Sequence, residues 1–428
     1  MSGRTRRRSP GVLRGAVPVV LVALAAIAGF AAVAAAALVV VRPVLFLAAG
    51  CVVFLAGGMV AARLLPAPRR RAGVVVVLAL SVLGGLVLLV HGPARAPRVL
   101  QGTRWATEPG GARLAYRELP AAGRRHQVPV IFLHGGPGVA DMAGDIPYLR
   151  RLAATGWDTY IYDQLGAGRS TRLADPNGYT LARAVADLDL IRRTIGAPRV
   201  DLLGYSWGST LASAYLAAHP DRVDKVVFAS PGPMVGGASD VTSLLGHAGA
   251  ASTTSVLGQV LRPRALLAWT LDQINPRAAH AYAGDAEMDA RFRAISATAA
   301  PALYCHPPGT HRAGDDDGPR EGDVGFYANA GLLRRSAWRD PHPALRRLNT
   351  PALIIKGQCD YVSWSSAVDY QDTLAHSHLV YLPGAGHRAY AERPTAFFTT
   401  VDAFLTGRRL PVRPYAGAGP PPGYRGPG

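Results

Sequence analysis

A serine, an aspartate and a histidine each close a strand-like run, in the order that serine-dependent hydrolysis uses. Ser206 lies between two glycines in "GYSWG", Asp360 ends "PALIIKGQCD", and His387 ends "SHLVYLPGAGH". A serine hydroxyl is a weak nucleophile until a histidine takes its proton and a carboxylate orients that histidine. Because the chain has 48 glycines, "GYSWG" alone could be a tight turn that needs small residues. The three elements together predict a catalytic triad of Ser206, Asp360 and His387.

Acyl transfer also needs N–H donors that stabilise the negatively charged tetrahedral oxygen. The N–H of Trp207, directly after the nucleophile, is one candidate. The loop "HGGPG" at His134–Gly138 follows an earlier aliphatic run, and its glycines allow the backbone to approach a substrate carbonyl closely. We therefore expect this loop to supply the second donor. The sequence shows no constellation of metal ligands and no phosphate-binding loop, so no cofactor or metal is expected.

These residues require a sheet that brings them together. In residues 99–232, and again in 348–410, short aliphatic runs alternate with helix-length stretches. This alternation predicts a parallel sheet with crossover helices, whose catalytic groups lie at the carboxyl ends of the strands. Residues 233–347 break the alternation and have a helical pattern, which predicts a cap over the site. Residues 411–428 are rich in Pro and Gly and are predicted to be disordered.

The first 98 residues predict a membrane segment. Three uncharged stretches, about residues 16–41, 44–62 and 73–90, each approach the ~20 apolar residues that a spanning helix needs. Residues 1–104 contain thirteen arginines and no lysine or acidic residue, so they carry +13 of the formal net charge of +18. Because these arginines flank apolar runs, we interpret them as a topology signal and expect no nucleic-acid partner.

The arginines also predict an orientation. Five of them precede the first apolar stretch and four separate the second from the third, whereas only Arg42 separates the first from the second. The positive-inside rule then leaves the C-terminal domain outside the cell membrane, and a cleaved signal peptide in place of the first span gives the same result. Cys305 and Cys359 fall in this domain, where a disulfide could persist. The sequence cannot pair them, and two inert buried thiols are the favoured interpretation.

Five motifs together resemble those of one enzyme family: "HGGPG", "YDQLGAGRS", "GYSWGST", "GQCD" and "GAGH". As a set they resemble the prolyl aminopeptidase (proline iminopeptidase) family of α/β-hydrolases, over roughly Arg113 to Phe404. The resemblance implies an α/β-hydrolase fold, a mostly parallel sheet with helices on both faces and a helical cap, here preceded by about three transmembrane helices. It also implies that the N–H groups of Gly136 and Trp207 form the oxyanion hole.

The chain departs from the family pattern at several positions. Leu165 stands where the family usually has arginine, and Gln-Cys precedes the acid where the family has Arg-Tyr. These departures leave the acyl specificity open. Family peptidases bind the free α-amino group of the substrate through cap carboxylates. The candidates here are Asp285, Glu287, Asp289 and Glu321, although a solvated acidic face is the simpler explanation.

The sequence therefore predicts a multi-pass, membrane-anchored serine hydrolase with an extracytoplasmic catalytic domain. Its leading function is that of an aminopeptidase that releases N-terminal residues, such as proline, from short peptides through an acyl-enzyme. One alternative is an esterase or lipase-like hydrolase of external or envelope substrates. A third interpretation is a non-catalytic membrane receptor that keeps the fold. The expected partners are a small peptide or ester substrate and the membrane, and the oligomeric state is open.

Overall fold

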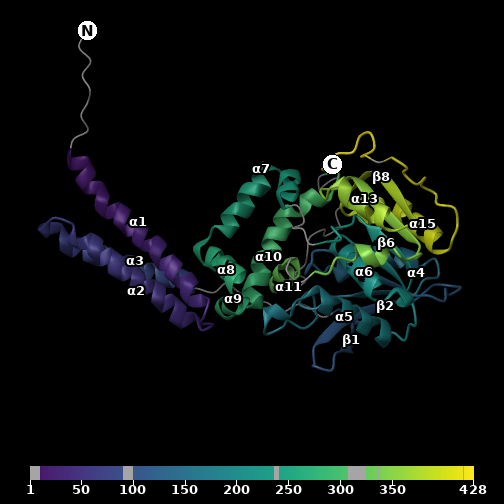
Figure 1. The fold of residues 1–428 in the computed structure, drawn as a ribbon, viewed down its shortest axis with the longest axis horizontal. Coiled ribbons are helices and arrows are strands. Elements are labelled where there is room, and N and C mark those ends of the chain that lie inside the picture. Colours follow the sequence, from purple (N-terminus) through teal and green to yellow (C-terminus); the bar gives the residue numbers. More distant parts are fainter. Residues whose placement is uncertain (1–9, 90–99, 236–240, 307–323, 335–337, 418) are drawn as a thin grey trace, which may run out of the picture. The chain divides into compact units, whose positions relative to one another are not determined.

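The computed structural model describes the chain except for residues 1–9, 90–99, 236–240, 307–323, 335–337 and 418. Figure 1 gives the order of its elements. By its internal contacts the chain divides into two compact units. The helical unit comprises Met1–Gly92 and Val260–Gly284, and the sheet unit comprises Pro93–Gln259 and Asp285–Gly428.

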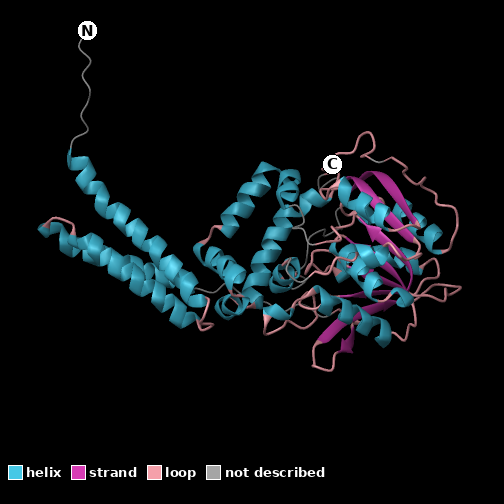
Figure 2. Ribbon diagram, viewed as in Figure 1, coloured by secondary structure: helices cyan, strands magenta, loops and turns pink. Residues whose placement is uncertain are grey.

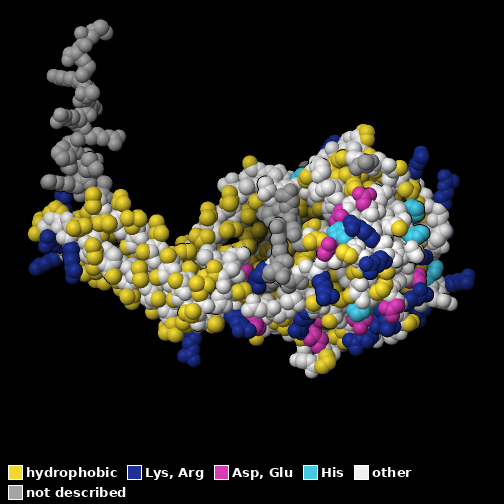
Figure 3. Space-filling view, viewed as in Figure 1, with side chains coloured by type: hydrophobic (Ala, Val, Ile, Leu, Met, Phe, Trp, Pro, Cys, Tyr) yellow, Lys and Arg dark blue, Asp and Glu magenta, His cyan; other side chains and the backbone are white. Residues whose placement is uncertain are grey.

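Three apolar helices make up most of the helical unit: α1 (Pro10–Ala37), α2 (Pro43–Arg63) and α3 (Ala67–Leu89). Each contains a stretch of 21 to 23 residues that is long and apolar enough to cross a membrane. On the face drawn in Figure 3, hydrophobic side chains cover these helices, and Lys and Arg side chains gather where α2 meets α3. Two short helices complete the unit, α8 (Pro263–Ile274) and α9 (Pro276–Tyr282).

Glycines allow α1 and α2 to pack closely. A Cβ on Gly29 would lie 2.9 Å from the carbonyl oxygen of Gly50, and one on Gly50 would lie 2.7 Å from that of Gly29. Both distances are shorter than a side-chain carbon tolerates. Close approach of two backbones at small residues is typical of helices that associate in lipid.

An eight-stranded sheet forms the core of the other unit (Figure 2). Its strand order is β1-β2-β4-β3-β5-β6-β7-β8. The β1–β2 and β2–β4 pairs are antiparallel, and all other pairs are parallel. The strands are β1 (Arg104–Thr107), β2 (Arg113–Leu119), β3 (Val130–Leu133), β4 (Thr159–Tyr162), β5 (Val200–Tyr205), β6 (Val223–Ala229), β7 (Ala352–Cys359) and β8 (Ser377–Gly386).

Helices cover both faces of this sheet. Successive side chains of a strand point to opposite faces. Val227 packs in one core cluster with Leu149 of α4 and Phe397 of α15, whereas the ring of Phe228 lies 4.5 Å from that of Tyr370 of α13. The helices outside the helical unit are α4 (Met142–Ala153), α5 (Leu181–Thr194), α6 (Trp207–Ala218), α7 (Val241–Val260), α10 (Asp285–Ala299), α11 (Phe326–Leu333), α12 (His342–Leu345), α13 (Trp364–Thr373), α14 (Ala389–Glu392) and α15 (Pro394–Leu405).

The predicted helical cap, residues 233–347, is divided between the two compact units. Helices α8 and α9 belong to the helical unit, while α10 and α11 belong to the sheet unit. A helical pattern predicts that a segment is helical. It does not indicate which surface will bury the apolar face, so this division could not be inferred from the sequence.

The C-terminal tail also differs from its expected disorder. The rings of Tyr415 and Tyr424 lie 5.4 and 5.2 Å from the ring of Trp364, the first residue of α13. The N–H of Trp364 donates to the carbonyl of Pro427, and the N–H of Arg425 donates to that of Gln358, both at 2.8 Å. The prediction of disorder rested on the high content of Pro and Gly. It did not consider that the rings of Tyr415 and Tyr424 could pack against Trp364.

Candidate active site

The residue between the two glycines of "GYSWG" occupies a strained turn. Ser206 follows β5 directly and precedes α6, with φ 54° and ψ −119°. A positive φ is uncommon for a residue other than glycine. A Cβ on Gly204 would lie 2.5 Å from the Gly208 carbonyl oxygen, and one on Gly208 would lie 2.0 Å from that of Leu133. Both glycines are therefore required by close packing, as at the strand-to-helix turn that exposes a nucleophile.

The expected acid and base are in contact. Asp360 follows β7 and His387 follows β8, and the imidazole Nδ1–H of His387 donates to Oδ1 of Asp360 at 2.6 Å. Both residues are buried. The rings of Tyr205 and Tyr361 lie 5.1 and 4.4 Å from the imidazole. Because these tyrosines are the chain neighbours of Ser206 and Asp360, the structure brings the three expected residues into one region.

Two backbone segments that carry the expected oxyanion donors adjoin the serine. A Cβ on Gly135 would lie 3.0 Å from the Cβ of Ser206, so the "HGGPG" loop passes directly beside it. Gly136 has φ +117°, and a Cβ there would lie 2.6 Å from the backbone nitrogen of Val139. Trp207 is the first residue of α6, where a backbone N–H has no partner within the helix and the helix dipole favours negative charge.

Gln164 links these two segments. Its Nε2 donates to the carbonyl of His134 at 2.9 Å, and its Oε1 accepts from the indole N–H of Trp207 at 3.1 Å. Its backbone N–H donates to Nε2 of His134 at 3.0 Å. Gln164 thus joins the two segments that carry the expected oxyanion donors. The sequence contained it within "YDQLGAGRS", but only the fold shows which groups it joins.

The hydrogen bonds of His134 define its protonation state. Nε2 accepts from the N–H of Gln164, and Nδ1 lies 2.9 Å from the carbonyl of Gly135, to which it must donate. Burial lowers the pKa of His134 to about 4. The imidazole is therefore neutral in the folded protein at pH 7.

The low pKa of His134 predicts a pH-dependent loss of stability. Between pH 6.5 and 4 the unfolded chain binds a proton at this histidine and the folded chain does not, so stability falls as the pH falls through this window. Relative to His134→Gln, the wild type should lose about 2–3 kcal/mol between pH 7 and 4.5. Midpoints of heat inactivation at both pH values measure this difference. Parallel losses in the two proteins would contradict it.

A buried lysine supports the acid, and we did not expect it from the sequence. Lys356 is fully buried, with Nζ 2.9 Å from Oδ2 of Asp360 and donating to the Val362 carbonyl at 2.7 Å. Burial alone would raise the pKa of Asp360, but Lys356 and His387 outweigh it and hold that pKa well below its usual range. The signal was a lone lysine in the aliphatic run "ALIIKGQC", four residues before the acid.

Cys305 and Cys359 form a disulfide, with their Cα atoms 5.0 Å apart. The interpretation as two inert thiols was therefore wrong. Cys359 directly precedes Asp360, so the bond fastens the chain at the acid to a segment 54 residues earlier. Glu392 also binds the Cys305 end of the disulfide, because its carboxylate accepts a hydrogen bond from the N–H of Cys305 at 3.0 Å. Sequence separation gave no sign of this proximity.

Among the expected cap carboxylates that the structure describes, Asp289 is connected to the "HGGPG" loop. Its Oδ1 accepts from the N–H of Phe326 at 2.8 Å, and the adjacent Gly325 donates its N–H to the carbonyl of Gly138 at 2.7 Å. Its Oδ2 lies 3.1 Å from the guanidinium of Arg172. Burial raises the pKa of Asp289 to about 6, and Arg172 opposes this shift.

The other candidates have different surroundings. Glu287 forms an ion pair of 2.8 Å with Arg291, one turn along α10. Asp285 lies in the first turn of the same helix, where a carboxylate interacts favourably with the helix dipole. Glu321 lies outside the described residues. Within the part of the chain that the structure describes, no three His, Cys, Asp or Glu side chains are arranged to hold a metal ion.

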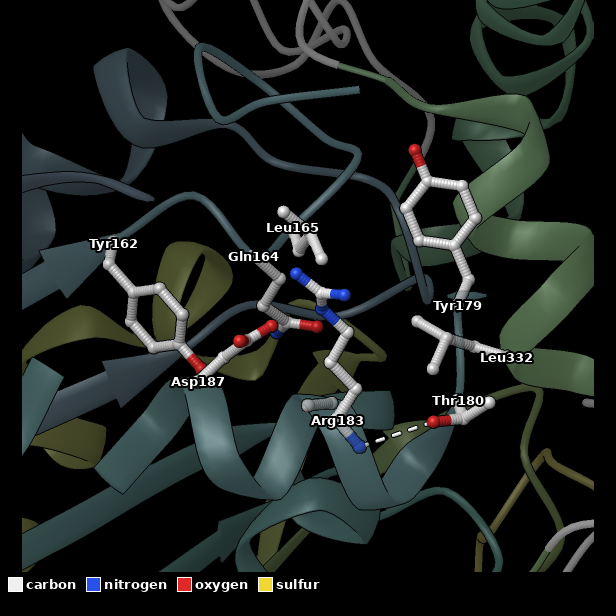
Figure 4. Close-up of a pocket in the computed structure, with 9 residues that line it drawn as sticks. Tyr162, Gln164, Leu165, Tyr179, Thr180, Arg183, Asp187 and Leu332 are labelled. Carbon is white, nitrogen blue, oxygen red and sulfur yellow. Dashed lines mark hydrogen bonds between the residues drawn. The ribbon is translucent and has the colours of Figure 1, made fainter. Parts of the chain in front are cut away.

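Gln164 and Leu165 line a small pocket that none of the three expected triad residues lines (Figure 4). Leu165, at the position where the family usually has arginine, lines this pocket together with Arg183. Arg183 pairs with Glu108. The guanidinium of Arg183, a residue of α5, therefore lines the same pocket as Leu165. The full lining is Tyr162, Gln164, Leu165, Tyr179, Thr180, Arg183, Ala184, Asp187 and Leu332.

Comparisons with known proteins agree with this arrangement. Residues 128–254 match the family model described as alpha/beta hydrolase fold. A proline iminopeptidase of Heyndrickxia coagulans is 39% identical over 123 residues, 28% of this chain and 40% of that protein. One of Xylella fastidiosa is 40% identical over 118 residues, 27% of this chain and 35% of that protein. The matches therefore span less than half the length of these relatives.

A solved structure shows the same fold over a greater length. An esterase from Exiguobacterium antarcticum has a TM-score of 0.50 at 17% identity, covering 71% of this chain and 98% of that chain. The chain thus has the α/β-hydrolase fold, as the motif order predicted. The resemblance to proline iminopeptidases is confirmed by relatives at about 40% identity, over a part of the chain.

Proposed function

We propose that this chain is a membrane-anchored serine aminopeptidase. Ser206 is the nucleophile, His387 the general base, Asp360 the carboxylate that orients the base, and the N–H groups of Gly136 and Trp207 are the oxyanion donors. The observation that carries the proposal is the strained Ser206 turn, with the His387–Asp360 hydrogen bond of 2.6 Å packed beside it.

The proposed reaction has two stages. The Ser206 oxygen attacks the substrate carbonyl while His387 takes the hydroxyl proton. The oxyanion that forms accepts hydrogen bonds from the two backbone N–H groups. His387 then gives that proton to the departing amine, which leaves an acyl-serine. Water attacks the acyl-enzyme in the same way and releases the N-terminal residue. Asp360 holds Nδ1–H throughout and stabilises the imidazolium, while Lys356 keeps Asp360 ionised.

Similarity to proline iminopeptidases supports a substrate with a free N-terminus. Burial of an α-ammonium costs free energy unless a carboxylate receives it. Of the described candidates, Asp289 is the best placed, because its partner Phe326 follows the residue that binds the "HGGPG" loop.

One observation favours an esterase instead. Asp289 and Glu287 already pair with Arg172 and Arg291, at 3.1 and 2.8 Å. A carboxylate that neutralises an arginine attracts a substrate ammonium less strongly. An esterase acting on external or envelope substrates needs no such carboxylate.

Substrate preference distinguishes the two enzymes. We expect prolyl- and alanyl-arylamides to be cleaved at least about tenfold faster, as kcat/KM, than their N-acetylated forms, because loss of one charge-assisted contact costs about 1.5 kcal/mol or more. Asp289→Asn should raise KM for the free amine more than for a neutral aryl ester, and Glu287→Gln is the matched control. Equal rates for acetylated and free amides, with far faster cleavage of short esters, would favour the esterase.

We also propose that α1–α3 anchor the chain in the cell membrane, with the catalytic domain on the outer side. The arginine distribution supports this orientation by the positive-inside rule. The Cys305–Cys359 disulfide supports it independently, since disulfides persist in oxidising compartments. Protease added to intact spheroplasts should remove a tag at Gly428, and protection of that tag would contradict the orientation.

A further inference from the structure

Within the helical unit, α8 and α9 contact the ends of all three apolar helices. Asn275, which joins them, donates its Nδ2–H to the carbonyl of Ala37 at 2.8 Å. The hydroxyl of Tyr282 donates to the carbonyl of Leu88 at 2.9 Å, and its ring lies 6.2 Å from that of Phe46. We call residues 261–282 the α8–α9 hairpin.

These contacts all lie at one end of the helical bundle. Ala37 is the last residue of α1, Phe46 lies in the first turn of α2, and Leu88 lies in the last turn of α3. Because short connections make consecutive helices antiparallel, these positions share one end, and the connection between Arg63 and Arg71 lies at the other. By the arginine rule the hairpin therefore covers the outer end.

The hairpin satisfies backbone groups that this end would leave without partners. The last four carbonyls of a helix have no intrahelical donor, and in an apolar environment each such group costs several kcal/mol. Asn275 and Tyr282 supply donors to α1 and α3, and the guanidinium of Arg264 also donates to Leu88. A cation at a helix C-terminus is favourable in addition. Arg264 is itself held by the carbonyl of Tyr282 at 2.9 Å.

The other side of α8 is exposed and mixed in character, because Leu266 and Ile274 lie there with Thr270 and Gln273. Leu267 and Leu271 are buried, whereas Leu266 and Ile274 are each 37% exposed and Leu261 is 61% exposed. With 3.6 residues per turn, Leu266 and Ile274 are about 80° apart around the helix axis, on one exposed side that also contains Thr270 and Gln273. Outside residues 10–89, which hold α1–α3 and their connections, the described residues expose five large hydrophobic side chains, and three of them are Leu261, Leu266 and Ile274.

We propose that the α8–α9 hairpin lies in the outer interfacial layer of the membrane, with Leu261, Leu266 and Ile274 in contact with lipid. The hairpin is attached to the ends of the apolar helices, because Asn275 and Tyr282 hydrogen-bond to α1 and α3. This inference rests on the proposed membrane anchoring. If the hairpin lies there, two separate segments of the chain contact the membrane: helices α1–α3 and the α8–α9 hairpin, which lies between α7 and α10 in the sequence.

Lipid quenching of single fluorophores tests the proposal. The full-length protein, with Cys51→Ala and its disulfide intact, receives Leu266→Cys or Ile274→Cys and an environment-sensitive thiol dye. Each variant is placed alone in phosphatidylcholine–phosphatidylglycerol nanodiscs whose lipids carry a spin label near the headgroup. We expect at least a twofold loss of emission at both positions. Thr399→Cys, exposed on α15, is the matched control and should keep its emission.

A dye on the native Cys51, exposed on α2, separates failure of this inference from failure of the anchoring. If acyl-chain spin labels quench Cys51 while positions 266 and 274 match the Thr399 control, the hairpin proposal is wrong and the anchoring stands. If no position is quenched, the anchoring fails and the hairpin proposal fails with it. Blue-shifted emission at 266 without lipid quenching would mean that protein covers this face, which also overturns the proposal.

Discussion

Ser206→Ala should lower turnover by about 10⁶-fold, and His387→Ala by a similar factor. Each removes one half of a proton-transfer unit, so the double variant should be little worse than either single one. Both should keep the thermal-unfolding midpoint of the wild type within a few degrees, since Lys356 still pairs with the buried Asp360 carboxylate in each variant. Initial rates on the best arylamide or ester measure the effect.

Ser213→Ala is the matched control for this substitution. Ser213 lies two turns along α6, and its hydroxyl donates to the Thr210 carbonyl of its own helix at 2.8 Å. Its turnover should stay within about twofold of the wild type, because loss of one neutral hydrogen bond costs about 1 kcal/mol of stability and touches no reacting atom. More than about one per cent of wild-type turnover in Ser206→Ala would rule out the mechanism.

Lys356→Met should be the most damaging change away from the reacting atoms. It leaves the Asp360 carboxylate buried without its cation, and removal of one partner of a buried ion pair costs about 3–5 kcal/mol. Turnover should fall as well, because an Asp360 that protonates or shifts no longer holds the imidazole. Chemical or thermal unfolding of the purified protein, followed with activity, measures both effects.

A double variant separates charge from shape at this pair. Lys356→Met with Asp360→Asn contains no buried charge, so it should recover much of the stability lost in Lys356→Met while remaining nearly inactive. If Lys356→Met alone is as stable and as active as the wild type, the lysine has no role in holding Asp360. If the double variant is less stable than Lys356→Met, packing rather than charge explains the loss.

The parts of the site that the sequence predicted have local causes. Ser206 stands between two glycines because the strand-to-helix turn leaves no space for a Cβ at either one, and that requirement is written in five adjacent residues. Asp360 and His387 end strands, and parallel strands present their ends at one edge of the sheet. Sequence order and position at the end of a strand-like run were therefore enough to choose these three residues as candidates.

The parts that could not be predicted depend on contacts between distant segments. Gln164 links His134 to Trp207 only after β3, β4 and β5 pair. The Cys305–Cys359 bond joins residues on opposite sides of 53 intervening positions, which a composition argument cannot bring together. Lys356 broke an aliphatic pattern, and that irregularity was the one available signal. In the sequence, the helical pattern of the α8–α9 hairpin does not differ from that of the other helices of residues 233–347. Only the contacts of Asn275 and Tyr282 with α1 and α3 distinguish it.

Covalent labelling tests the central claim most directly. A fluorophosphonate reacts with a serine that is activated by a neighbouring base and an oxyanion hole, so the wild-type protein should gain one phosphonyl group, on the peptide that contains Ser206. Ser206→Ala should gain none, and Ser213→Ala should be labelled as fast as the wild type. A wild-type protein that stays unlabelled while hydrolysing substrate, or one labelled at another serine, would contradict the account.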